Sequence, residues 1–590
     1  MNNFWKVFFA SILGVFFAFG LVIFLVFGSF SLAFSSFKTE APTIVENSIL
    51  HIDFKSEIPD RTSSNPLSNF DFSSMQSNKS IGLNDVLKSI DKAKTDDNIK
   101  GIFIDISVMS SGMATTEEIR NALIDFKESE KFIIAYSDVL SQTAYYLASV
   151  ADKIYLNPQG AIDWKGLYSQ VMFFKGALEK LGVEVQVFRH GKFKSAIEPY
   201  ILDKMSEENK LQTLTYVKSL WDHLVEGIAE TRDISVEELN LYADNLSVEN
   251  ALAAYDFKFV DSLVYRDFVL EELKEMANYG KDDDKFLISI NKYSKAPVKS
   301  AVKEISKNRV AVIFAEGTIV DGKGSDGEIG GDNLAAEIRK ARKDENIKAV
   351  VLRVNSPGGS GLASEIILHE MVLLKEEKPV VISMGSLAAS GGYYIACKSD
   401  YIFALPNTLT GSIGVFGMLP NLQKLFENKL GLSFDGIGTN AHSDFGNTSR
   451  SVDELEYRRV QAQVENFYDV FITHVAEGRN MSKEEVDEIG QGRVWSGLNA
   501  LEIGLVDEIG GLNDAIKKAV ELAGLEDYRI KEMPEKKDFF ETMLEDLTSQ
   551  VSIKSLEAEF GENLKYLDIL RYINNAKGVQ ARLPYEIYVY

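Results

Sequence analysis

The chain has 590 residues, of which 45% are hydrophobic and 25% are charged. This composition is typical of a globular protein and excludes a largely disordered one, and the length allows two large domains or up to about four ordinary ones. The net charge of −24 argues against nonspecific binding to nucleic acid. The single cysteine, Cys397, cannot form a disulfide within its own chain, and we expect it to be a small buried residue and not a second nucleophile.

The N-terminus carries a long apolar segment. No charged residue lies between Lys6 and Lys38. The segment predicts a helix over about residues 7–29, long enough for a bilayer core that needs about 20 residues. A cleaved signal peptide has a shorter apolar region of about 7–15 residues, so we expect an uncleaved anchor within residues 1–45. Lys6 favours an N-terminus in the cytoplasm, which would place the part of the chain after the anchor on the far side of the membrane.

A large unit is repeated within the chain. The sequence KTDDNIKGIFIDI from Lys94 matches RKDENIKAVVLRV from Arg342, an offset of 248 residues. The same offset aligns AYYLASVADKIYLNP from Ala144 with GYYIACKSDYIFALP from Gly392. Two matches at one spacing indicate duplication of a whole domain.

Each copy alternates predicted helices with apolar strands, which predicts an α/β fold with a mostly parallel sheet. We place the first copy at 46–300 and the second at 301–525, joined by a lysine-rich polar stretch around residue 300. Residues 526–590 are charged and amphipathic and predict a C-terminal extension of helical character, to which the sequence assigns no chemistry.

The two copies differ where chemistry is expected. Ser390, in SLAASGGYY, follows the predicted strand PVVISM and precedes two glycines. At the corresponding position the first copy has Gln142, and Thr143 and Ala144 replace the glycines. A strand-to-helix turn alone would explain a serine cap and flexible glycines, but the first copy keeps the turn without them. The comparison therefore favours Ser390 as a nucleophile.

A second glycine-rich loop, NSPGGSG, follows the strand AVVLRV. Ligands of open α/β sheets bind at the carboxyl ends of the strands, and such a loop exposes backbone N–H groups there. The amides of Gly358 or Gly359, together with that of Gly391, are therefore candidates for an oxyanion hole.

A serine nucleophile requires a base, and neither His369 nor His442 lies in a familiar triad pattern. The first copy offers Lys194 in FKSAIEPY, whereas the aligned segment of the second copy, around Ser443, has no lysine. A neutral lysine can serve as the base for serine, provided that burial lowers its pKa.

Two residues close to Lys194 leave alternatives open. Lys192 is the competing candidate for the base. Ser195 is placed either to orient the amine of Lys194 or to cap the helix that follows.

Five segments in order, FKSAIEPY, NSPGGSG, AASGGYY, GSIGVFG and GRVWSGLNALEIGLVDEIGG, make the chain resemble the long, duplicated form of the signal peptide peptidase A (protease IV) family. The resemblance implies tandem Clp-protease/crotonase-like domains, preceded by one transmembrane helix. It also implies a Ser/Lys dyad with Ser390 as nucleophile and Lys194 as base, and an oxyanion site at Gly391 with Gly358 or Gly359.

The same resemblance implies a peptidase of the bacterial inner membrane that degrades signal peptides and other hydrophobic peptides on the periplasmic side. It would work as a homo-oligomer, such as a tetramer, without metal or cofactor. Two alternatives are a crotonase-type acyl-thioester enzyme, which would need neither Ser390 nor Lys194, and a noncatalytic oligomeric membrane scaffold.

Overall fold

The computed structural model describes residues 42–63, 70–71, 76–77, 80–280, 285–297, 306–325, 327–535 and 579–583, with residues 5, 8 and 14. The expected anchor over residues 7–29 lies almost wholly outside these ranges. Within the described parts of the chain, no helix combines the length and the apolar character needed to cross a bilayer.

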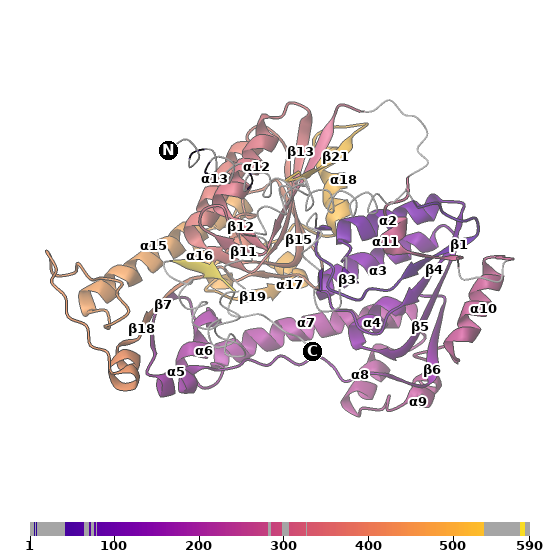
Figure 1. Cartoon of the computed structure of the whole chain (residues 1–590), viewed down its shortest axis with the longest axis horizontal. Coiled ribbons are helices and arrows are strands. Elements are labelled where there is room, and N and C mark those ends of the chain that lie inside the picture. The colour runs from indigo at the N-terminus through magenta and orange to yellow at the C-terminus, as the bar shows by residue number, and fades with distance from the viewer. Residues whose placement is uncertain are drawn as a thin grey trace.

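The first copy is built on a six-stranded parallel sheet, drawn in indigo and magenta in Figure 1. Its strand order is β8-β6-β5-β4-β1-β9, and every pair in it is parallel. Parallel strands require crossover connections, which the helices of this copy provide. The strands are β1 Ser48–Ile52, β4 Ile99–Asp105, β5 Phe132–Leu140, β6 Lys153–Ile162, β8 Ser262–Leu263 and β9 Leu287–Ser289.

Helices and a few short elements complete this copy. The helices are α2 Leu83–Thr95, α3 Met113–Lys127, α4 Gln142–Ala148, α5 Lys175–Leu181, α6 Glu198–Ile201, α7 Glu207–Thr231, α8 Val236–Asp244, α9 Ala251–Asp256, α10 Arg266–Met276 and α11 Ile290–Tyr293. A separate strand, β7 Glu184–His190, a 3-10 turn, η1 Ser195–Ile197, and a small hairpin, β2 Phe70–Asp71 with β3 Gln76–Ser77, lie outside the parallel sheet.

The second copy has its own sheet, in the order β19-β17-β15-β13-β10-β21, with β16 and β20 branching from β15. Its strands are β10 Arg309–Glu316, β13 Ile347–Ser356, β15 Val380–Ala389, β16 Tyr401–Ala404, β17 Leu409–Gly411, β19 Val494–Ser496, β20 Glu508–Ile509 and β21 Arg529–Met533. Strand β21 pairs with β10, so the second copy reaches at least Met533, beyond the end at 525 that the sequence suggested.

The helices of the second copy are α12 Gly331–Lys343, α13 Gly361–Lys375, α14 Gly391–Tyr394, α15 Glu454–Arg479, α16 Lys483–Ile489, α17 Gly497–Glu502 and α18 Leu512–Leu522, with a π-helical turn, η2 Leu425–Leu430. Helices α12 and α13 begin and end 248 residues after α2 and α3. Strands β4 and β5 likewise begin 248 residues before β13 and β15. The repeat found in the sequence is therefore a structural duplication.

A third sheet joins the two copies. Its order is β12-β11-β14-β22-β18-β7, from β11 Thr318–Val320, β12 Glu328–Gly330, β14 Gly358–Ser360, β18 Val415–Asn421 and β22 Gln580–Arg582 together with β7. Strand β7 belongs to the first copy but pairs antiparallel with β18 of the second along all seven of its residues. This pairing carries the chain of the first copy into the second.

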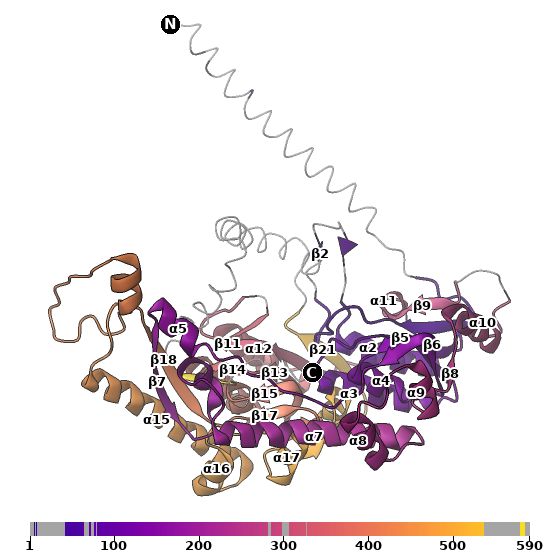
Figure 2. The ribbon, with the colours of Figure 1, turned by 90° about the horizontal axis from the view of Figure 1, so that it is seen from below.

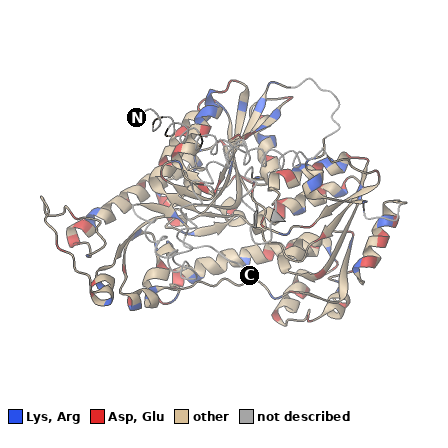
Figure 3. Ribbon diagram, in the orientation of Figure 1, with Lys and Arg blue, Asp and Glu red and all other residues tan. Residues whose placement is uncertain are grey.

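Helix α7 also bridges the copies, running along one side of both in Figures 1 and 2. Around its middle, Tyr216 and Leu220 pack in a cluster with apolar residues of the second copy. Nearer its end, Leu224, Val225 and Ile228 join the main core of the first copy. Acidic and basic residues are interspersed along the outer helices (Figure 3).

A buried ion-pair cluster lies between the copies. Arg353 of β13 is fully buried, and its Nη2 lies 2.8 Å from Oδ1 of Asp60 and 2.6 Å from Oε1 of Glu118. Both carboxylates come from the first copy, and Glu118 also accepts the N–H of Leu512 at 2.8 Å. The guanidinium therefore holds the two copies together where water is excluded.

We expect Arg353→Met to lower the free energy of unfolding by about 3–5 kcal/mol, because it leaves two buried carboxylates without their cation. Chemical denaturation of the two proteins checks this value. Lys517→Met is the matched control, because Lys517 is exposed beside Asp514 and its loss should change stability by no more than about 0.5 kcal/mol. Equal stability of the Arg353 variant and the parent would contradict the structural role of this cluster.

Candidate active site

Ser390 occupies the sharp turn between β15 and α14. Its backbone has φ 56° and ψ −114°, a conformation that residues other than glycine rarely adopt. The turn is held because the N–H of Ser390 donates to the carbonyl of Gly411 at 2.8 Å, and α14 begins at the next residue. A strand-to-helix turn of this kind presents the side chain at the edge of the sheet.

Lys194 reaches this serine from the other copy. Strand β7 pairs with β18 up to His190 opposite Val415, and four residues later the chain arrives at Lys194. The Nζ atom of Lys194 lies 2.9 Å from Oγ of Ser390, although 196 positions separate the two residues in sequence. The structure thus brings together the serine whose counterpart is missing from the first copy and the lysine whose counterpart is missing from the second.

The amine of Lys194 is enclosed. The side chain has no exposed surface, and its Nζ lies 6.0 Å from the centre of the Phe416 ring. Burial disfavours the charged form and holds the pKa of Lys194 well below its usual range. A lysine in this state can accept a proton at a pH where an exposed lysine cannot.

Ser412 completes the surroundings of the amine. Its Oγ lies 3.1 Å and its carbonyl oxygen 3.3 Å from Nζ of Lys194, so both serve as acceptors for the amine hydrogens. Ser412 is fully buried at φ 49°, and its N–H donates to the carbonyl of Arg493 at 2.7 Å. No sequence signal pointed to a role for Ser412, although it lies in the GSIGVFG segment that carried the family resemblance.

The two neighbours of Lys194 point elsewhere. The Oγ of Ser195 accepts a hydrogen bond from Nε2 of Gln212 at 2.9 Å. Lys192 is exposed, and its amine lies 5.4 Å from the centre of the Phe193 ring. The contacts to the amine of Lys194 therefore come from Ser390 and Ser412, and Ser195 holds the segment against α7.

The glycines of NSPGGSG lie beside Ser390. The N–H of Gly358 donates to Oγ of Ser356 at 3.1 Å, so this amide already has an acceptor. A Cβ on Gly391 would lie 3.1 Å from the amide nitrogen of Gly359, and one on Gly358 would lie 2.6 Å from that of Gly391. The backbones of the two loops thus approach each other closely, and side chains would not fit between them.

The first copy has the corresponding strand and helix, but it lacks the serine and the glycines at the turn between them. Gln142 begins α4, as the residue after the serine begins α14. Its Oε1 accepts the N–H groups of Lys165 and Gly166, each at 2.8 Å, and its Nε2 donates to the carbonyl of Gly166. Gln142 therefore braces a loop at the position where the second copy carries Ser390.

The remaining candidates lie outside this site. His369 is exposed on α13. Cys397 is buried, its Sγ donates to the carbonyl of Tyr394 at 3.2 Å, and burial raises the pKa of its thiol to about 12. It is therefore a poor nucleophile at neutral pH.

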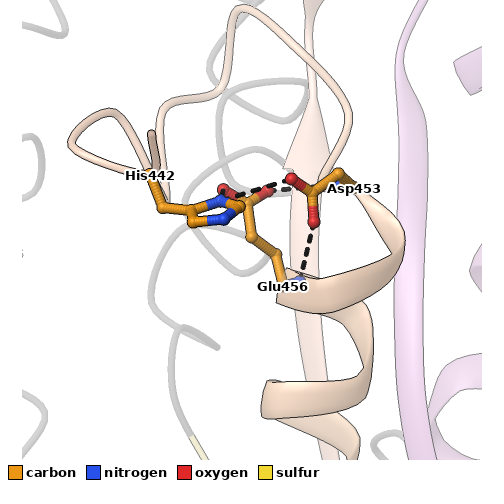
Figure 4. A group of neighbouring side chains, drawn as sticks. All are labelled: His442, Asp453 and Glu456. Atoms are coloured by element: carbon orange, nitrogen blue, oxygen red, sulfur yellow. Dashed lines mark hydrogen bonds and ion pairs between the residues drawn. The ribbon is translucent and has the colours of Figure 1, made fainter. Parts of the chain in front are cut away.

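His442, Asp453 and Glu456 form a cluster with spacing suited to a metal ion (Figure 4). Arg450 already pairs with Glu456, with an Nη2 to Oε1 distance of 2.7 Å. Glu456 also accepts the N–H of Asp453 in the capping box that begins α15. The carboxylates of Asp453 and Glu456 thus already form the capping box of α15, and that of Glu456 also pairs with Arg450.

Both copies of the chain match a known peptidase family. Residues 125–280 and 372–526 each match peptidase family S49, one segment in each copy. The chain is 37% identical to Protease 4 of Salmonella typhi, with 80% of this chain and 77% of that protein covered. It is 38% identical to Protease 4 of Haemophilus influenzae, with 75% and 73% covered.

A plant relative is similar over the same region. The chloroplastic serine protease SPPA of Arabidopsis thaliana is 32% identical, with 76% of this chain and 67% of that protein covered. Since both copies match the family and the similarity spans most of three proteases, the chain belongs to peptidase family S49 and is a serine peptidase with two tandem α/β domains of that family.

Proposed function

We propose that the chain hydrolyses peptides by a Ser/Lys dyad, with Ser390 as nucleophile and Lys194 as general base. The observation that supports this most is the 2.9 Å contact between Nζ and Oγ, made by two buried groups from different domains. No ordinary packing requirement calls for a buried lysine without a carboxylate at that place, whereas a Ser/Lys pair with a lowered amine pKa is an established form of the triad.

The reaction begins when neutral Lys194 accepts the hydroxyl proton of Ser390 and Oγ forms a bond to the substrate carbonyl carbon. The tetrahedral intermediate then expels the amine, to which Lys194 returns the proton, and an ester to Ser390 remains. Lys194 next takes a proton from water, the resulting hydroxide attacks the ester, and the acid product leaves with the serine restored.

Backbone amides would stabilise the charge that develops on the carbonyl oxygen. We assign this role to Gly359 and Gly391, because the N–H of Gly358 already donates to Ser356. Each such donor contributes on the order of 3 kcal/mol to the transition state. A crotonase-type enzyme would use similar amides, but it would have no need of the Lys194–Ser390 contact. A noncatalytic scaffold would need neither.

The substrates that we propose are signal peptides and other hydrophobic peptides, as the resemblance to signal peptide peptidase A implies. The apolar segment near the N-terminus would hold the enzyme at the bacterial inner membrane with its catalytic domains on the periplasmic side. Assembly into a homo-oligomer, such as a tetramer, would follow the same family pattern. Two of the similar proteins are named Protease 4 and one SPPA.

Replacing either member of the dyad tests the mechanism. We expect Ser390→Ala and Lys194→Ala each to lower kcat/KM for a fluorogenic peptide by at least about 10³, with no larger loss in the double variant, because the two groups act as one unit. Lys192→Ala is the matched control and should retain activity, since Lys192 is exposed. Full activity of either single dyad variant would overturn the proposal.

The pH dependence provides a second test. Catalysis needs neutral Lys194, so kcat/KM should fall as the pH drops through the folded-state pKa of this amine and should reach a plateau above it. Because burial holds that pKa well below the usual range, the plateau should begin well below the value of about 10.4 typical of free lysine. Rate measurements between pH 5 and 10 check this. A tenfold rise per pH unit that continues to pH 10 would contradict it.

The position of Lys194 depends on a close glycine contact. Gly492 has φ +84°, and a Cβ there would lie 2.7 Å from N, Cα and Cβ of Lys194. Gly492→Ala should therefore displace the lysine and lower kcat by about 10–100-fold. Gly322→Ala, at φ +74° with nothing within 4 Å, imposes similar backbone strain without a clash and should leave kcat unchanged. Equal effects of the two variants would show that strain, and not lysine placement, is responsible.

A further inference from the structure

Strand β22 lies beside the catalytic residues, although it comes from the C-terminal extension. It runs antiparallel to β14 on one side, with Gly359 opposite Ala581, and antiparallel to β18 on the other, with Phe416 opposite Gln580. Two further backbone hydrogen bonds extend the pairing with β14. The N–H of Gly361 donates to the carbonyl of Val579 at 3.1 Å, and the N–H of Leu583 donates to the carbonyl of Pro357 at 2.7 Å.

The carbonyl oxygen of Ala581 lies where the two glycine loops meet. A Cβ built on Gly391 would be 2.9 Å from this oxygen and 3.1 Å from the amide nitrogen of Gly359. A Cβ on Gly358 would be 2.2 Å from the same oxygen. Gly391 directly follows Ser390, so the carbonyl of Ala581 lies close to the turn that carries the nucleophile and to the loops that carry the amides assigned to the oxyanion.

The side chains of this strand are also accommodated. Ala581 is fully buried and Leu583 is 2% exposed. Leu583 packs in a cluster with Tyr216 and Leu220 of α7 and with Leu409 and Val494 of the second copy. The site therefore encloses a small side chain at position 581 and an apolar one two residues later.

This arrangement also explains a feature of the dyad. Ser390 and Lys194 both have no exposed surface, so a substrate can reach them only if a neighbouring segment moves aside, and β22 pairs with the strand that carries Gly359. Addition of an extended segment between existing strands is a general mode of peptide recognition, in which the backbone gives affinity and pockets give specificity.

We propose that residues 579–583 are a tethered, substrate-like occupant of the active-site groove, bound in the register that presents the carbonyl of Ala581 to Ser390. This inference rests on the proposed function and deepens it. The enzyme would be restrained by its own C-terminal segment, and its substrates would be extended peptides with a small residue before the cleaved bond and an apolar residue two positions later.

A tethered occupant competes with substrate at an effective concentration that can reach about the millimolar range. Removing it should therefore lower KM and leave kcat unchanged. We expect a chain that ends at residue 578 to show a KM at least about fivefold lower than that of the full chain for a short peptide. A chain that ends at residue 583 keeps β22 and is the matched control, with KM as in the full chain.

Ala581→Trp in the full chain provides a test that does not depend on truncation. The fully buried site has no room for an indole, so the strand should leave the groove and KM should fall as in the chain that ends at residue 578. An unchanged KM in both the truncated chain and this variant would overturn the proposal.

Binding measured without catalysis separates this inference from the proposed function. A fluorescent peptide with the sequence of residues 579–583 should bind the Ser390→Ala chain that ends at residue 578 at least about tenfold more tightly than the full-length Ser390→Ala chain, as followed by anisotropy. The same peptide carrying Ala581→Trp should bind at least about tenfold more weakly. Equal binding to both chains would refute the tethered occupant, whether or not Ser390 proves catalytic.

Discussion

The proposed active site depends on the antiparallel pairing of β7 with β18. For the proposed role as a base, the lysine must be neutral, and on the surface water would restore its pKa near 10.4. The β7–β18 ladder brings the first copy's chain into the second copy and leaves Lys194 enclosed beside Phe416 and Ser412. The distance to Ser390 and the lowered pKa of the amine both follow from this one piece of backbone geometry.

In the proposed mechanism, the duplication lets the two copies divide the roles of nucleophile and base. One copy with both residues would have to provide the nucleophile, the base and the cover over the base by itself. In two copies, one turn can keep Ser390 in a strained conformation while its counterpart uses Gln142 to brace a loop. The arrangement then requires that the copies not move apart. Arg353, buried between Asp60 and Glu118, and helix α7, packed on both cores, supply that constraint.

The sequence predicted the duplication, the α/β fold and the contact of Ser390 with Lys194. The two repeats align at one spacing, so the few positions at which one copy has a reactive side chain and the other does not could be identified. It did not predict Ser412, since a serine after a glycine matches many turns and only its distance to the amine of Lys194 gives this residue a role. Nor did it predict the Arg353 cluster, because charged residues in a strand and a helix acquire partners only through the relative placement of the copies.

The most difficult feature to predict was β22. A segment of three residues has no sequence pattern of its own that identifies a strand, and β22 forms because it pairs with the edges of β14 and β18. Those edges explain its presence. Without it, β14 and β18 would expose backbone groups next to each other, and unpaired strand edges readily accept any extended chain. A peptide substrate that replaces β22 makes equivalent backbone bonds, so exchange between occupant and substrate changes the number of hydrogen bonds little. The free energy that distinguishes them then comes mainly from the side chains at the positions of Ala581 and Leu583, where the protein is most closely packed around the strand.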